Sequence, residues 1–240
     1  MRYAKAIFVT AISIVLSACN ENGKINAEVN LPATSTAVPT VKPAIGAASA
    51  TAENPEPSFD CAKADSSAQK LVCTDPNLAA LDREVDRLFL LAKNGKSLSD
   101  ERRKELLALQ RGWIKGRDDC WKSDDLRYCI VDSYVSRIHE LRQGYAEARS
   151  EDAKGISEGP TALKCEGLDA LVSVTRVKSS PLSVFLGWTN RWVVLEAGKD
   201  GSGYAGKAFD GTFRLSVKDA DLLFEQPDKS ILKCVDEPTG

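Results

Sequence analysis

The placement of seven cysteines constrains this chain of 240 residues more than any other feature. Cys19 follows an uncharged apolar stretch, residues 6–16, that is shorter than the roughly 20 residues needed to span a bilayer. With Arg2 and Lys5 before it, this stretch has the length and flanks of a secretory signal peptide. Secretion implies an oxidising compartment, where an even number of further cysteines predicts disulfides. These further cysteines are Cys61, Cys73, Cys120, Cys129, Cys165 and Cys234.

The sequence alone does not settle how these cysteines pair, because many connectivities are possible. The pairs 61–73, 120–129 and 165–234 are the simplest combination. A zinc site is the alternative, but the sequence has no Cys-x₂-Cys pair and its single histidine, His139, lies apart from the cysteines. We therefore expect three disulfides, no metal and no cofactor.

The four residues Leu16-Ser17-Ala18-Cys19 resemble the lipobox of bacterial lipoproteins. The resemblance implies a signal peptide over residues 1–18, cleavage before Cys19, and acyl chains such as palmitate on that cysteine, which would anchor the protein to a membrane. Asn20 in place of Asp implies, by analogy with lipoprotein sorting, the outer membrane of a Gram-negative envelope, facing the periplasm. A secretory leader without lipidation is the alternative.

Composition divides the rest of the chain. Residues 19–58 hold five of the ten prolines and almost no large apolar side chains, which is typical of a disordered tether. A second polar stretch, residues 151–160, is expected to be a linker between two domains. The formal net charge of −2 is not that of a basic nucleic-acid binder, so we expect no nucleic-acid partner.

Residues 59–150 have the apolar spacing of helices. Asp75 followed by Pro76, then Ser99, and then Asp124 or Asp125 supply N-caps for three helices. His139 lies mid-helix between core positions and is expected at the surface. The predicted stripes are Leu78, Leu81, Val85, Leu88 and Phe89; Leu106, Leu109, Trp113, Ile114 and Arg117; and Leu126, Ile130, Tyr134, Ile138, Leu141 and Tyr145.

In residues 161–240 the apolar residues no longer follow helical spacing. Short apolar runs at 168–177, 191–197, 204–209, 212–217 and 230–234 indicate strands, and Asp210-Gly211 is a hairpin signal. The predicted fold class is α+β in separate domains: a small disulfide-stapled helical bundle followed by a small antiparallel β-barrel.

The helical part resembles the LprI-type domain of bacterial envelope lipoproteins, a family linked to lysozyme inhibition. The matching motifs are Phe59-Asp60-Cys61-Ala62-Lys63, Cys73-Thr74-Asp75-Pro76-Asn77-Leu78, Gln110-Arg111-Gly112-Trp113, Arg117-Asp118-Asp119-Cys120, and Cys129 with Tyr134, Arg137, Ile138 and Leu141. The resemblance implies a disulfide-stapled helical binding module.

The β part resembles the MliC-type inhibitors of c-type lysozyme. The matching motifs are Lys164-Cys165-Glu166-Gly167, Asp200-Gly201-Ser202-Gly203-Tyr204, Phe213 through Lys218-Asp219-Ala220-Asp221-Leu222, and Lys233-Cys234. Arg214-Leu215 stands where that family has a Trp near its Lys, and no Gly follows Lys218.

The second resemblance implies the mode of inhibition. C-type lysozyme cleaves its glycan with two carboxyl groups in a cleft. Ser202 and Lys218 would enter that cleft from neighbouring loops, Gly201 and Gly203 would allow close backbone approach, and Tyr204 would add a contact. The expected partner is therefore a c-type lysozyme.

The sequence bears on two other functions. An enzyme is not expected, because His139 is the only imidazole and no nucleophile elbow, phosphate loop or paired-acid motif is present. The alternative is an envelope module that binds another periplasmic protein or peptidoglycan without inhibiting lysozyme. In that case Trp188 and Trp192 could stack on a sugar, although Trp192 is expected in the core.

Overall fold

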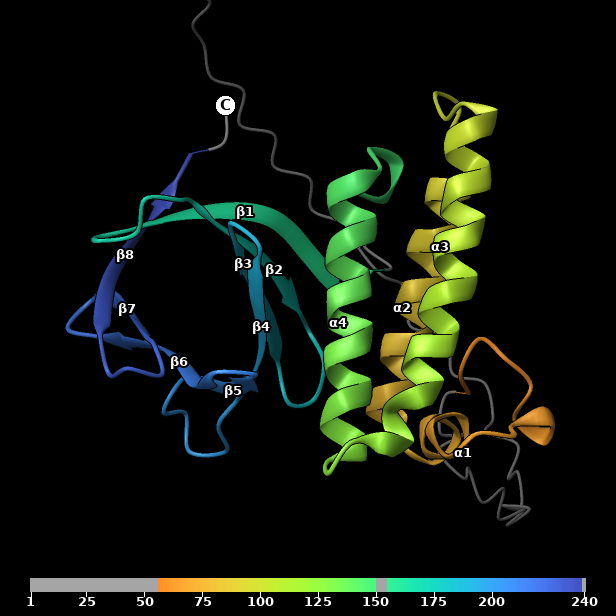
Figure 1. Cartoon of the computed structure of the whole chain (residues 1–240), viewed down its shortest axis with the longest axis horizontal. Helices are drawn as coiled ribbons and strands as arrows, with labels where there is room; N and C mark the ends of the chain where they lie inside the picture. Colours follow the sequence, from red (N-terminus) through yellow and green to blue (C-terminus); the bar gives the residue numbers. More distant parts are fainter. Residues whose placement is uncertain (1–55, 150–154, 239–240) are drawn as a thin grey trace, which may run out of the picture. The chain divides into compact units, whose positions relative to one another are not determined.

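The computed structural model of the chain describes residues 56–149 and 155–238 (Figure 1). The predicted signal peptide, Cys19 and nearly all of the predicted tether lie outside the described residues. Among the helices in the described ranges, none has both the length and the apolar character needed to cross a membrane.

The first half of the described chain is helical. Its elements are a 3₁₀ turn Cys61–Lys63, α1 Ser67–Thr74, α2 Pro76–Lys93, α3 Asp100–Asp118, a 3₁₀ turn Asp119–Lys122, α4 Leu126–Gly144 and a 3₁₀ turn Glu147–Arg149.

Side-chain caps explain where the helices begin. Asp75 accepts hydrogen bonds from the backbone N–H groups at the start of α2, and Ser99 and Asp125 cap α3 and α4, as predicted. Helix α1 was not predicted from the sequence. Its signal was the reciprocal capping pair of Ser66 and Gln69.

The apolar stripes of α2 and α4 are buried as predicted except at Phe89 and Leu126, which are partly buried, and the stripe of α3 is buried only in part. Leu106 is fully buried, whereas Leu109 remains 50% exposed. Arg117, at the other end of the same stripe, is buried because it donates to the Tyr134 hydroxyl at 2.9 Å and lies 3.6 Å from the Asp82 carboxylate.

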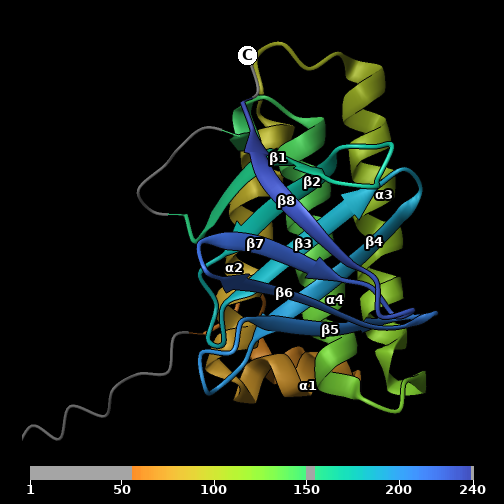
Figure 2. The ribbon, with the colours of Figure 1, turned by 90° about the vertical axis from the view of Figure 1, so that its left-hand side faces the viewer.

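The second half forms a closed eight-stranded antiparallel barrel in which each strand pairs with the next and β8 pairs with β1 (Figure 2). This arrangement confirms the predicted fold class. The strands are β1 Ser157–Cys165, β2 Val172–Val177, β3 Ser183–Trp188, β4 Arg191–Ala197, β5 Tyr204–Ala208, β6 Gly211–Lys218, β7 Asp221–Glu225 and β8 Ile231–Glu237.

Three of these strands were not predicted, namely β1, β3 and β7. β1 begins at Ser157, inside the segment expected to be a linker, so the polar composition of that segment does not keep it out of the sheet. The domain boundaries themselves stay a prediction.

Three disulfides are present among the described residues, and they join the nearest-neighbour pairs named above. Cys61–Cys73 and Cys120–Cys129 hold the helical part, with Cα atoms 5.8 and 5.6 Å apart. Cys165–Cys234 links β1 to β8, where these two residues are also register partners. This bond therefore crosses the seam at which the barrel closes.

Helix α4 packs on both of its sides, against the other helices and against the barrel (Figure 1). The expectation that His139 lies at the surface is wrong: it is 4% exposed. Its ring stacks on Phe185 of β3 at a centroid distance of 3.8 Å, and Nδ1 lies 2.9 Å from Thr175 Oγ1. Desolvation lowers the pKa of His139, which favours the neutral form of the ring.

Trp188 was expected to be available to a ligand and Trp192 to lie in the core, but the structure shows the reverse. The reason is that side chains along a strand point alternately into and out of the barrel. Trp188 lies inside the barrel with Phe213 and Phe224, at ring centroid distances of 5.7 and 5.4 Å. Trp192 lies on the same outward face of β4 as Val194. α4 covers Val194 but leaves Trp192 55% exposed.

Candidate functional site

The loop that carries Ser202 is a tight connection between β4 and β5, residues 198–203. The N–H of Gly198 donates to the carbonyl of Gly203 at 2.8 Å, which closes the base of the loop. Gly203 has φ 106°, and a Cβ there would lie 2.4 Å from the Leu215 carbonyl oxygen of β6. A glycine is therefore required at 203 by the barrel itself, independently of any partner.

Lys218 ends β6, directly before the two-residue turn to β7. Asp219 and Ala220 both have positive φ, 52° and 70°, which gives the turn the twist that suits a tight hairpin. Lys218 pairs in register with Asp221, the first residue of β7. Its side chain is therefore held at the rim of the barrel.

The strand register brings these two loops to the same rim. Tyr204 pairs with Leu215 in an antiparallel ladder, so residues before Tyr204 run beside residues after Leu215. This places Ser202 beside the end of β6, where Lys218 lies. Between the loops is a hollow of about 340 Å³, lined by Gly201, Ser202, Gly203, Tyr204, Leu215, Ser216, Val217 and Leu222.

The two predicted site residues differ in their surroundings. The Ser202 hydroxyl and backbone N–H hydrogen-bond to Asp200, which lowers the pKa of that carboxyl. Lys218 makes no ion pair with any described residue. Asp221, its register partner, is instead paired with Lys233 at 2.8 Å. Tyr204 is half-buried and packs against the barrel core.

Helix α4 holds the strands beneath the Ser202 loop. The Tyr128 hydroxyl donates to the Val194 carbonyl of β4 at 2.8 Å and accepts from the Lys207 N–H of β5 at 2.9 Å. Burial raises the pKa of Tyr128 to about 12. Arg127 lies 3.2 Å from both Asp75 and Glu196, so it ties α4 to the start of α2 and to β4.

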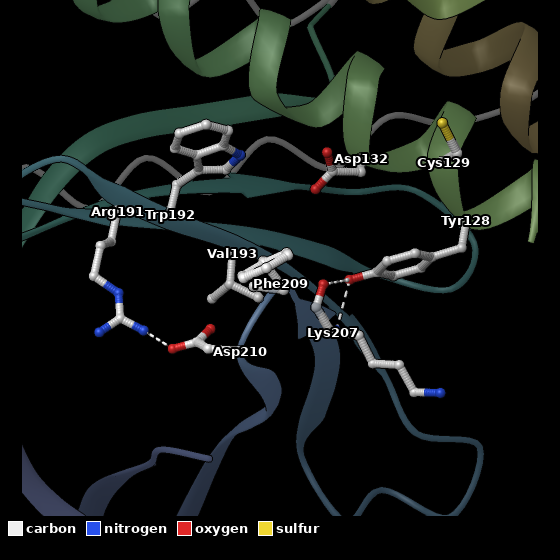
Figure 3. Close-up of a pocket in the computed structure, with 10 residues that line it drawn as sticks. Tyr128, Cys129, Asp132, Arg191, Trp192, Val193, Lys207, Phe209 and Asp210 are labelled. Carbon is white, nitrogen blue, oxygen red and sulfur yellow. Dashed lines mark hydrogen bonds and ion pairs between the residues drawn. The ribbon is translucent and has the colours of Figure 1, made fainter. Parts of the chain in front are cut away.

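A second, larger pocket of about 610 Å³ lies between α4 and the β3–β4 and β5–β6 turns (Figure 3). The pocket was not predicted from the sequence, although Trp192, one of its residues, was named as a side chain that could stack on a sugar. Its lining residues are Tyr128, Cys129, Asp132, Arg191, Trp192, Val193, Lys207, Ala208, Phe209 and Asp210. No cluster of three or more metal-ligating side chains occurs within residues 56–149 and 155–238.

Comparisons with known proteins identify relatives of part of the chain. A stretch of 135 residues, 56% of the chain, is 30% identical to a protein named lipoprotein LprI from Mycobacterium bovis, and the same holds for lipoprotein LprI from two strains of Mycobacterium tuberculosis. The matched stretch covers 54% of each relative, so the chain spans about half the length of the curated relatives it matches. No protein-family model matches the chain, and no solved structure matches it.

Proposed function

We propose that this protein is a lipid-anchored envelope protein that inhibits a c-type lysozyme. The similarity to lipoproteins named LprI supports the lipoprotein class. The motif resemblance of the β part to MliC-type inhibitors supports the target. Cys19 would carry the lipid anchor and hold the protein at the membrane, by this proposal the outer membrane, facing the periplasm.

The observation that carries the proposal is the shared rim of Ser202 and Lys218. A lysozyme cleft presents two carboxyl groups, one protonated and one ionised. A cation and a hydroxyl that arrive together from one rim can meet both groups. Loops at opposite ends of a barrel could not enter one cleft.

Each residue has a defined task in this proposal. Lys218 pairs with the ionised carboxylate of the enzyme, and it needs to break no ion pair within the described residues to do so. Ser202 hydrogen-bonds the other carboxyl group. Its contact with Asp200 holds the loop before the enzyme arrives, which lowers the ordering entropy that binding must overcome.

Such an ion pair contributes more to blocking the site than to net affinity, because desolvation of the ammonium offsets the attraction. Removal of the ammonium, however, leaves the carboxylate of the enzyme buried without its partner. The proposal therefore predicts a larger loss on truncation of Lys218 than the ion pair alone contributes.

The test is clearance of a bacterial cell-wall suspension by a c-type lysozyme. The chain is used from residue 19 onward with Cys19→Ser, which removes the predicted lipid. Inhibition that saturates at one inhibitor per enzyme supports the proposal. Protection that follows binding of the chain to the cell wall, with no complex between chain and enzyme, contradicts it and favours the envelope-binding alternative.

A further inference from the structure

The pocket between α4 and the barrel combines two exposed aromatic side chains with a carboxyl group that has no partner (Figure 3). Trp192 is 55% exposed, and Phe209, in the β5–β6 turn, is fully exposed. Large apolar side chains that are kept in water forgo roughly 25 cal/mol for each Å² left unburied. Two such side chains at the mouth of one pocket are the usual mark of a binding surface.

Asp132 supplies the polar group of this pocket. It projects from α4, and in Figure 3 its carboxylate points to the side on which Trp192 lies. It makes no hydrogen bond or ion pair with any described residue. The residue is partly buried, and this burial raises its pKa to about 6 because no donor in the described residues compensates for the lost water. A ligand with hydrogen-bond donors would supply one.

The charges of the pocket select the class of ligand. Two acidic residues, Asp132 and Asp210, are balanced by two basic ones, Arg191 and Lys207, and Arg191 pairs with Asp210. The Lys207 ammonium points away from Trp192 (Figure 3). This balance favours a neutral ligand over an ion. The ligand must also present an apolar face to rings and donors to a carboxylate.

A sugar ring has both properties, because its C–H bonds form an apolar face and its hydroxyl groups lie around the edge. We propose that the pocket is a saccharide site, in which a pyranose ring stacks on Trp192 and Phe209 and its hydroxyl groups donate to Asp132. A volume of about 610 Å³, open to solvent, has room for more than one ring.

The site lies at the opposite end of the barrel from the Ser202 and Lys218 rim. In an up-and-down barrel successive turns alternate between the two ends, so the β3–β4 and β5–β6 turns share one end and the β4–β5 and β6–β7 turns share the other. A saccharide and a lysozyme could therefore be held at the same time. The saccharide site does not depend on lysozyme inhibition.

The test is isothermal titration of the Cys19→Ser chain with a tetramer of N-acetylglucosamine and, separately, with maltotetraose. The variants are Trp192→Ala and Asp132→Asn. The matched control is Trp121→Ala, which removes a tryptophan that is 63% exposed but outside the pocket. Circular dichroism of each variant verifies folding, and the cell-wall assay measures lysozyme inhibition.

We expect the chain to bind at least one of the two sugars. Trp192→Ala should weaken binding at least tenfold and Asp132→Asn severalfold, while Trp121→Ala leaves it unchanged. All three variants should inhibit lysozyme as the parent does, so a failure of either proposal is visible separately. Absence of binding to both sugars, or equal binding by parent and Trp192→Ala, overturns the saccharide site.

Discussion

The Tyr128 hydroxyl donates a 2.8 Å hydrogen bond to the Val194 carbonyl and so joins helix α4 to the barrel. β4 and β5 pair directly only at Glu196–Ala205 and Ala197–Tyr204. Extended by two residues, this register sets Val194 opposite Lys207, and the hydroxyl bridges their backbone groups. A side chain from the helical part thus completes the ladder below the Ser202 loop.

Tyr128→Phe tests this bridge. The variant keeps the ring but leaves a carbonyl and an N–H without their shared partner. We expect a loss of about 1–3 kcal/mol in the free energy of unfolding, measured by urea denaturation. Tyr145→Phe is the control, because the Tyr145 hydroxyl makes no hydrogen bond with any described residue; it should change stability by less than about 0.5 kcal/mol. Equal stability of Tyr128→Phe and the parent would show that the bridge contributes nothing.

The helices and the barrel should unfold together. Val177, Phe185 and Val194 of the barrel belong to the same buried cluster as the core of α2 and α4. Because removal of either part would expose this cluster, we expect one cooperative transition. Helical circular dichroism and tryptophan fluorescence should then give coincident curves in urea. A barrel transition separate from the helical one would contradict the shared core.

Asp132 should make the protein less stable as the pH rises. Its pKa is about 6 in the folded chain, against 3.8 as the ordinary value, so the folded state binds more protons between these values. The free energy of unfolding therefore falls as the pH rises from about 4 to about 6. Asp132→Asn should gain about 1–3 kcal/mol at pH 7, and the gain should shrink toward zero near pH 4.

The control for this pH dependence is Asp169→Asn, which changes an exposed aspartate that makes no ion pair with any described residue. Its stability curve against pH should follow that of the parent. A gain for Asp132→Asn that is the same at pH 4 and pH 7 would mean that the titration of Asp132 is not its cause.

Among the described elements, α2, α3, α4 and five of the eight strands could be predicted from the sequence because caps and periodicity act locally. Asp75, Ser99 and Asp125 each accept hydrogen bonds from N–H groups within a few residues. The starts of α2, α3 and α4 can therefore be predicted from the nearby sequence alone. α1 was missed although its capping pair, Ser66 and Gln69, is equally local.

The errors arise where tertiary contacts decide the outcome. β3 is covered on both faces, by the barrel interior and by α4, so it lacks the alternation that identifies a strand. His139 faces away from the other helices, and only the barrel makes that side of α4 a buried one. Trp192 lies on the outward face of β4, at a point of the strand that α4 does not cover. None of this is present in the local sequence.

The residues themselves predict the candidate rim only as two separate motifs, and the expectation that the two loops are neighbours came from the resemblance to MliC-type inhibitors. Lys218 follows the last glycine of the Gly-Ser-Gly motif, Gly203, by fifteen residues, and no local sequence signal predicts that the two lie close together. The register of β5 with β6 brings them to the same end of the barrel. For the proposed saccharide pocket the sequence offered Trp192 alone, as a side chain that could stack on a sugar; the pocket itself could not be predicted, since its residues come from α4, β4 and the β5–β6 turn.

The inhibition constant of Lys218→Ala against a c-type lysozyme decides whether the Lys218 ammonium blocks the enzyme. Lys229→Ala, which removes an exposed lysine at the opposite end of the barrel, is the control. We predict that Lys218→Ala weakens inhibition by about 2–5 kcal/mol, because it leaves a buried carboxylate of the enzyme without a partner. Lys229→Ala should leave the inhibition constant unchanged. An inhibition constant for Lys218→Ala equal to that of the parent would contradict the claim.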